Sequence, residues 1–124
     1  GNTRAAYGQY LRLVEQYPDS ETGQRALAEM ALEFNDWDAA RRHGRLAAEL
    51  APDDPLVQAV NATVAYRDAR AGDDPETAAA AVRRASALVE DHPDLMAARQ
   101  VLIDDLIRRQ DWTGALAAID AALA

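Results

Sequence analysis

The sequence contains no cysteine, so disulfides, thiol nucleophiles and thiolate metal sites are excluded. Cysteine usage therefore does not indicate the redox compartment, and the location is unknown from the sequence, with the cytoplasm favoured and the periplasm left open. No run approaches the roughly 20 apolar residues of a membrane span, so membrane insertion is not expected. A start at Gly1 without an initiator methionine is typical of a fragment, so a targeting segment could lie outside it.

Lysine is also absent, and all 13 cationic side chains are arginine. Arginine-only usage favours a GC-rich bacterial genome as its cause, and selection for bidentate contacts with carboxylates is the alternative. Because 21 residues are acidic, the net charge is −8 at pH 7. Nucleic acids and anionic membranes both need a basic patch, so neither is expected as a partner.

Motifs for catalysis and for cofactor binding are missing as well. The six glycines are scattered singly, so there is no glycine-rich phosphate loop. His43 and His92 are isolated and lack metal-ligand spacing, so we expect them to be exposed or to cap helices. The only serines, Ser20 and Ser86, are outside any nucleophile elbow. Neighbouring carboxylates are interpreted as helix caps or solvated residues, so no enzyme, metal or cofactor is expected.

Proline and glycine are few, with five and six residues, so little of the chain is loop. Alanine, the best helix former, occupies 29 of the 124 positions. No long run of valine, isoleucine or threonine suggests a sheet. The sequence therefore predicts a single all-α domain with close contacts between helices.

Three Pro-Asp pairs divide the chain at spacings of 34 and 41 residues, beginning at Pro18, Pro52 and Pro93. Proline disfavours helix in the residue before it, so each pair ends a helix. The Asp of each pair, or Ser20 or Asp54 beside it, is expected to cap the next helix.

A second repeat appears when the chain is shifted by 75 residues. The matched positions are Leu27 with Leu102, Leu32 with Ile107, Asp36-Trp37 with Asp111-Trp112, Ala40 with Ala115, and Ala47 with Ala122. Asp36, Asp74 and Asp111 are expected to be N-caps, with Pro75 in a first turn. Seven helices are predicted, near residues 3–17, 20–35, 37–50, 54–71, 75–91, 94–109 and 112–123.

The 34-residue helix–turn–helix unit that ends in Pro-Asp resembles the tetratricopeptide repeat family. The matching residues are Leu27, Ala28, Asp36, Trp37, Ala40, Ala47 and Pro52, and then Leu102, Asp111, Trp112, Ala115 and Ala122. The resemblance implies a right-handed α-solenoid of about seven antiparallel helices. Within residues 1–124, its parts are a second helix (3–18), a repeat (20–52), an irregular longer repeat (54–93) and a last repeat (94–124). The family's second-helix aromatic is replaced by Gly44 and Ile119, and other α-solenoids remain the alternative.

Packing in such an array depends on stacking neighbours. Ala40 and Ala47 are expected at contacts between helices, and Trp37 and Trp112 are expected to be buried anchors at the turns. Both ends of the array are expected to lack cover, which a longer parent chain or self-association would supply. The uncovered residues are Tyr7, Tyr10, Leu11 and Val14 at the start and Leu116, Ile119 and Leu123 at the end.

In this family the first helix of each pair lines a concave groove. The positions that the resemblance places there are Arg25, Glu29, Leu32, Glu33, Thr63, Tyr66, Arg67, Arg70, Gln100, Asp104, Ile107 and Arg108. The candidate partner-binding residues among them are Arg25, Glu29, Tyr66, Arg67, Gln100, Asp104 and Arg108. Glu29 replaces an asparagine of the family's carboxylate clamp, so that clamp is not expected.

The expected function is a protein–protein interaction scaffold that binds a peptide or a helix in this groove. One alternative is an accessory repeat region of a larger bacterial enzyme, such as a transferase or a thioredoxin-like protein. Another is the helical part of a transcriptional regulator.

Overall fold

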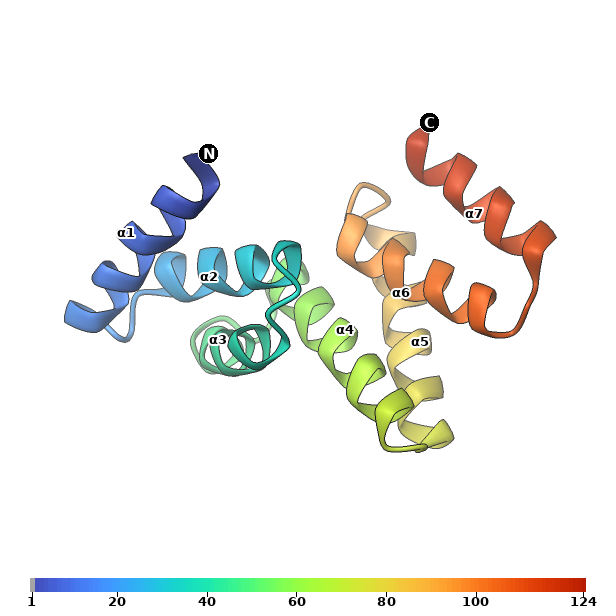
Figure 1. The fold of residues 1–124 in the computed structure, drawn as a ribbon, viewed down its shortest axis with the longest axis horizontal. Helices are drawn as coiled ribbons and strands as arrows, with labels where there is room; N and C mark the ends of the chain where they lie inside the picture. The colour runs from blue at the N-terminus through green and yellow to red at the C-terminus, as the bar shows by residue number, and fades with distance from the viewer. Residues whose placement is uncertain (1) are drawn as a thin grey trace. The chain divides into compact units, whose positions relative to one another are not determined.

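The structure, a computed structural model, describes residues 2–124 and the side chains from Thr3 onward. Every regular element in that range is an α-helix, and no strand occurs in it. The elements are α1 (Asn2–Gln16), α2 (Glu21–Glu33), α3 (Trp37–Leu50), α4 (Pro55–Ala71), α5 (Pro75–Asp91), α6 (Met96–Arg108) and α7 (Trp112–Leu123) (Figure 1). The all-α class and the seven predicted helices are confirmed, with boundaries within two residues of expectation.

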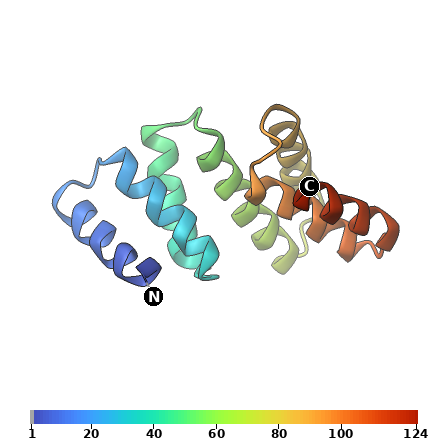
Figure 2. The same cartoon turned by 90° about the horizontal axis from the view of Figure 1, so that it is seen from above.

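The described chain forms two compact units that divide within α4, between Asn61 and Ala62. In unit 1, α1 packs on α2 and α2 packs on α3. In unit 2, α5 packs on α6 and α6 packs on α7. Consecutive helices within a unit run in opposite directions (Figure 2). The right-handed superhelical path concerns how the units follow one another and stays a prediction.

Each Pro-Asp turn is closed by a side chain that lies six residues after the proline. Gln24 Nε2 donates to the carbonyl oxygen of Pro18, and Gln58 Nε2 donates to that of Pro52, both at 3.0 Å. Arg99 Nε donates to the carbonyl of Pro93 in the same way. The same hydrogen bond thus recurs in all three turns. A side chain in the first turn of the following helix donates to the carbonyl oxygen of the proline, which would otherwise lack a partner.

The helices that follow these turns begin with unequal caps. The hydroxyl of Ser20 accepts from the backbone N–H of Gly23 at 3.1 Å, as predicted. Asp54 Oδ1 accepts from the backbone N–H groups of Leu56 and Val57. The expectation that Asp94 caps α6 is wrong, because the N-cap residue is Leu95, which has no capping side chain. α6 therefore begins without the stabilisation of about 1 kcal/mol that such a cap contributes.

The other three turns share one backbone geometry. The second residue after each helix has a positive φ: Asn35 at 58°, Asp73 at 54° and Gln110 at 59°. The next residue in each case is the predicted N-cap aspartate, Asp36, Asp74 or Asp111, whose carboxylate accepts a backbone N–H three residues on. Thr77 also donates to Asp74, and these hydrogen bonds to the carboxylate hold the pKa of Asp74 below its ordinary value. Each of these three chain reversals therefore consists of a residue in the left-handed conformation followed by an N-cap aspartate.

Small residues bring α2, α3 and the first half of α4 close together. Ala40 and Ala47 are fully buried, as expected for contact points between helices. Asn61 Nδ2 donates to the carbonyl of Gly44 at 3.0 Å. A Cβ added to Gly44 would lie 2.7 Å from the Asn61 side-chain oxygen. Tetratricopeptide repeats, which the sequence resembles, have an aromatic residue at the position of Gly44. The glycine in this chain lets α4 approach the backbone of α3.

The two tryptophans differ, although they occupy equivalent repeat positions. Trp37 is half-buried in unit 1. Trp112 is 62% exposed in unit 2, so the prediction that it is a buried anchor is wrong. An aromatic ring becomes an anchor only where a further element packs over it, and nothing in unit 2 does so at Trp112.

Candidate functional site

The first helices of the two clearest repeats carry matching rows of exposed polar side chains. We define the α2 strip as Arg25, Glu29 and Glu33, and the α6 strip as Gln100, Asp104 and Arg108. Each row has the i, i+4, i+8 spacing that places side chains along one face of a helix, and all six residues are exposed. The two strips are related by the 75-residue shift of the repeat. The six residues are exposed, and their place in a concave partner-binding groove stays a prediction.

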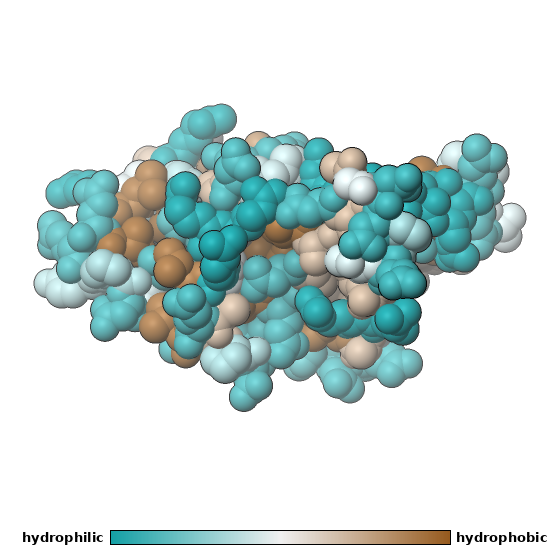
Figure 3. All heavy atoms as spheres, turned by 90° about the horizontal axis from the view of Figure 1, so that it is seen from below, coloured by the Kyte–Doolittle hydropathy of each residue, from teal (hydrophilic) through white to brown (hydrophobic). Residues whose placement is uncertain are grey.

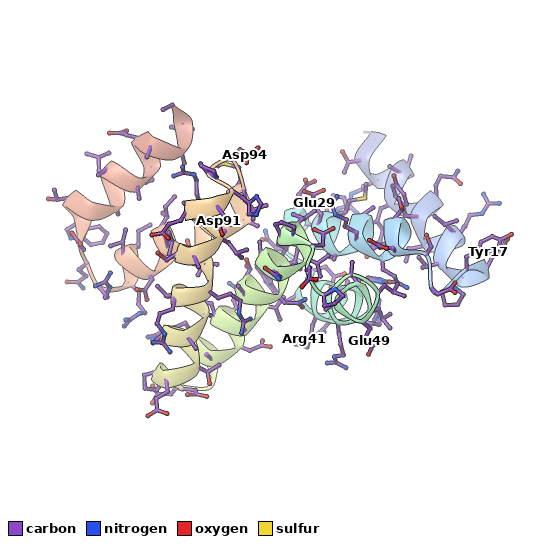
Figure 4. All side chains as sticks on the ribbon, turned by 180° about the vertical axis from the view of Figure 1, so that it is seen from behind. Tyr17, Glu29, Arg41, Glu49, Asp91 and Asp94 are labelled. Atoms are coloured by element: carbon purple, nitrogen blue, oxygen red, sulfur yellow. The ribbon has the colours of Figure 1, made fainter. Side chains whose placement is uncertain are left out.

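The α2 strip is anchored at one end to the start of α4, inside unit 1. Arg25 Nε contacts Asp54 Oδ2 at 2.7 Å, and Asp54 is the same residue that caps α4. Glu29 lies on the α2 side of the α2–α3 pair, whereas Arg41 and Glu49 lie on the α3 side (Figure 4). An exposed ion pair of this kind contributes at most about 1 kcal/mol, so a partner's carboxylate can compete for Arg25 at low cost.

The α6 strip is held by contacts along its own helix in unit 2. Gln100 Nε2 donates to Asp104 Oδ1 at 2.8 Å. Arg108 Nε and Arg109 Nε contact the two carboxylate oxygens of Asp105, at 3.6 and 3.1 Å. The Asp105 side chain is only 14% exposed, so it orients both arginines at the end of the helix. Arg108 is therefore positioned by a neighbouring carboxylate and is not a free cation.

Tyr66 occupies a different environment from the one expected. Its side chain is buried, at 7% exposure, and its hydroxyl donates to Asp105 at 3.1 Å. Burial raises the pKa of Tyr66, and the nearby carboxylate of Asp105 raises it further. Tyr66 thus joins α4 to α6 within unit 2, and its part in a partner-binding groove stays a prediction.

The remaining candidates are placed as follows. Arg67 is exposed on α4, whereas Thr63 and Arg70 on the same helix are half-buried. Arg25 and Glu29 belong to unit 1, and the other five candidates belong to unit 2. Tyr66 and Arg108 are brought together around Asp105, and Gln100 is brought to Asp104. A single groove that joins residues of both units stays a prediction.

Sequence reasoning missed a buried polar bridge between α2 and α3. His43, expected to be exposed or to cap a helix, is only 4% exposed, and Gln24 is only 2% exposed. His43 Nδ1 lies 2.8 Å from Gln24 Oε1. Because Gln24 Nε2 donates to Pro18, its Oε1 is the acceptor, and we assign the imidazole hydrogen to Nδ1. His43 lies between the buried Ala40 and Ala47 at helical spacing, and this periodicity was the signal that could have revealed it.

The bridge is electrically neutral. Burial lowers the pKa of His43, and the adjacent Arg42 guanidinium lowers it further, while Asp36 acts in the opposite direction. In the residues that the structure describes, no buried side-chain nitrogen or oxygen lacks a hydrogen-bond partner. The Gln24–His43 pair is accordingly a satisfied core contact and not a site that awaits a ligand.

The described residues contain neither a cluster of metal-ligating side chains nor a membrane-spanning helix. Among those residues, no three His, Cys, Asp or Glu side chains gather as a metal site would need. None of the helices that the structure describes is long and apolar enough to cross a membrane. No protein-family model matches the sequence, and no curated protein is detectably similar to it.

Proposed function

We propose that the chain is a helical-repeat scaffold of the tetratricopeptide type that binds a peptide or a helix of a partner protein. The observation that carries the proposal is the repeated exposed strip on α2 and α6. Both strips fall on first helices, and each lies on a unit whose antiparallel helices are held by buried alanines. Helical repeats commonly use such first-helix faces as extended binding surfaces.

The charges of the strips indicate the chemistry of the partner. The central residue is acidic in both, Glu29 and Asp104, and arginines flank them at Arg25 and Arg108. Hydrophilic side chains dominate the face drawn in Figure 3, where apolar ones surface in separate patches. A peptide that carries both basic and acidic side chains fits this pattern better than a polyanion, which the central carboxylates would repel.

The proposal can be tested without knowing the natural partner. A displayed library of random peptides is selected on the protein, and the bound peptides are mapped by changes in the backbone amide NMR spectrum. Glu29→Arg and Asp104→Arg reverse the central charge of each strip. Glu49→Arg makes the same change at an exposed position on the α3 side and is the matched control.

We expect the selected peptides to carry both basic and acidic residues and to perturb amides of α2 and α6. Each strip variant should weaken binding by about tenfold, which corresponds to about 1.4 kcal/mol, and Glu49→Arg should bind as the wild type does. A selection that enriches no peptide would count against the scaffold. Normal binding by both strip variants, together with loss in Glu49→Arg, would move the site to the second helices.

A further inference from the structure

Two polar side chains are buried between the helices of unit 1. Tyrosine aside, Gln24 and His43 are the only polar or charged residues among the described residues that are buried. His43 Nδ1 on α3 donates to Gln24 Oε1 on α2 at 2.8 Å, and Gln24 Nε2 donates to the carbonyl oxygen of Pro18 in the α1–α2 turn at 3.0 Å. Because one amide makes both contacts, the imidazole and the turn are linked through a single side chain.

The other imidazole nitrogen faces a cation. Nε2 of His43 lies 3.5 Å from Nη2 of Arg42. With the imidazole hydrogen on Nδ1, Nε2 carries a lone pair, which the guanidinium group attracts. Protonation would place a second N–H and a positive charge opposite that cation, on a side chain that is buried. The bond to Gln24 would remain, since Nδ1 donates in both forms, so the cost of protonation comes from burial and from Arg42.

The groups that other elements bring near the imidazole do not remove this cost. Asp36, in the α2–α3 turn, favours the protonated form, but burial and Arg42 outweigh it, so the pKa of His43 is lowered. The polar contacts that α2 and α4 make with this part of α3 come from neutral amides, Gln24 at the imidazole and Asn61 at the carbonyl of the next residue. The imidazole is therefore held neutral in the folded state.

α1 brings two ionisable side chains to this part of unit 1, and neither titrates between pH 5 and pH 7.5. Tyr7 is half-buried and meets the Phe34 ring edge-on at 5.6 Å, and burial raises its pKa, so it stays neutral. Arg4, 5.0 Å from the centre of the same ring, stays cationic. A Cβ on Gly23 would lie 2.7 Å from Val14, so α1 packs closely on α2. The expectation that the first helix lacks cover is therefore wrong.

Unit 2 has no buried histidine at the equivalent contact. The 75-residue shift carries Gln24 and His43 to Arg99 and Ala118. Arg99 donates to the proline carbonyl of its own turn, and a guanidinium group does not titrate near neutral pH. His92 is half-buried at the end of α5, where it is the C-cap residue. Among the described residues, His43 is therefore the only buried imidazole.

We propose that unit 1 is acid-labile: mild acid opens the α2–α3 contact and the turn that Gln24 closes, whereas the opening of unit 2 is unchanged. The open form of unit 1 exposes the imidazole to water, where it binds a proton with the ordinary histidine pKa of about 6.5, while the folded form binds it less readily. The stability that neutral His43 contributes is therefore present above that pKa and is lost as pH falls below it. The α2 strip belongs to unit 1 and the α6 strip to unit 2, so acid loosens one of these two surfaces and not the other.

The size of the effect has a ceiling set by the same equilibrium. At pH 5 an imidazole of ordinary pKa is protonated in about 97% of open molecules, which favours opening by at most about 30-fold relative to neutral pH. Any protonation of the folded form reduces this factor. We therefore expect opening of unit 1 to increase by between about threefold and about 30-fold, a range that amide hydrogen exchange resolves for local opening.

Hydrogen exchange followed by NMR tests the proposal on the whole chain at pH 7.5 and pH 5. Rates are expressed as protection factors, so that the intrinsic pH dependence of amide exchange cancels. Ala28 and Ala47 report on unit 1, and Ala85 and Val101 report on unit 2, since all four are buried in helices. Amides of α7 are set aside, because the outer side chains of this helix are exposed, as the sequence predicted for the last helix.

Two variants make the same substitution in the two units. His43→Gln removes the titrating group and keeps a side chain that can donate to Gln24, and His92→Gln is the control at the half-buried histidine of unit 2. Circular dichroism at pH 7.5 verifies that both remain helical. In the wild type and in His92→Gln, we expect protection in unit 1 to fall by between about threefold and about 30-fold on acidification, and protection in unit 2 to change by less than about twofold. In His43→Gln neither unit should respond.

Equal losses in both units would overturn the proposal, because the chain would then open as one body. Constant protection in unit 1 would do the same, and a response that persists in His43→Gln would assign the acid sensitivity to another group. The imidazole ¹⁵N shifts of the wild type give a check that needs no variant: His43 should carry its hydrogen on Nδ1 at pH 7.5 and titrate with a midpoint below the ordinary value of about 6.5. A midpoint at or above that value would contradict the proposal. No peptide is involved, so these results are independent of the proposed function.

Discussion

The α2–α3 pair and the α6–α7 pair are built from the same repeat pattern but are buried to different extents. Leu27 and Ala47 are fully buried in the first pair, whereas their counterparts Leu102 and Ala122 are only half-buried in the second. The first pair lies between α1 and the first half of α4, while the outer face of α7 is exposed. A repeat motif therefore specifies which face of a helix packs, whereas the neighbouring helix determines how far that face is buried.

Overpacking the two equivalent alanines should give the largest difference between the pairs. Ala47→Leu inserts three carbons where the side chain has no exposed surface, and should cost about 1–3 kcal/mol. Ala122→Leu makes the same change at a half-buried position near the end of α7, where the new side chain can turn toward solvent. We expect the loss there to be well under half of that at Ala47, measured by urea unfolding.

Equal losses at the two positions would show that α7 is packed as tightly as α3, and the comparison between the pairs would fail. An unchanged midpoint for Ala47→Leu would be a more serious result. It would mean that Ala47 faces solvent and that the helical register of α3 is incorrect.

Dependence of stability on pH should also separate the two pairs. The first contains the buried Gln24–His43 bridge, whose counterparts in the second are Arg99 and Ala118. The pKa of His43 is lowered in the folded state, mainly by burial. The unfolded chain therefore binds a proton more readily, and stability is retained above the ordinary histidine pKa of about 6.5 and is lost as pH falls below it.

Thermal unfolding between pH 7.5 and pH 5 measures this effect, with His43→Gln as the control because glutamine adds no titrating group. The wild type should lose more stability on acidification than His43→Gln does, since protonation adds a charge beside the Arg42 guanidinium in a buried position. Identical pH profiles for the two proteins would show that the imidazole remains hydrated in the folded state, contrary to its 4% exposure.

The seven helices could be predicted because their limits are local. Pro18 stops a helix whatever surrounds it, and Asp36 and Asp111 cap the next helix through hydrogen bonds within three residues. Solvent exposure of Glu29 and Asp104 could also be predicted, because the spacing of polar and apolar residues along a helix indicates which face is exposed. These features need no knowledge of which helix packs on which.

Burial of the aromatic and polar residues could not be predicted, because it depends on helices distant in sequence. Tyr66 is buried through a contact with Asp105, which lies 39 residues away. His43 finds its partner Gln24 across a helix pair, at a separation of 19 residues. Trp112 repeats the motif of Trp37 but has no helix over it. In each case tertiary packing determines whether the side chain is buried, and the periodicity of a single helix carries no information about that packing.

The smallest expected difference concerns the turn within each pair. Asn35 and Gln110 hold equivalent left-handed positions, with φ of 58° and 59°. Asparagine tolerates this conformation better than glutamine does, so Gln110→Gly should stabilise the chain by about 0.5 kcal/mol, after allowance for the greater freedom of glycine when unfolded, and Asn35→Gly should change it less. Precise chemical denaturation would detect this as a higher midpoint for Gln110→Gly alone. If Gln110→Gly destabilised the protein, the left-handed turn between α6 and α7 would not be the conformation that the chain adopts.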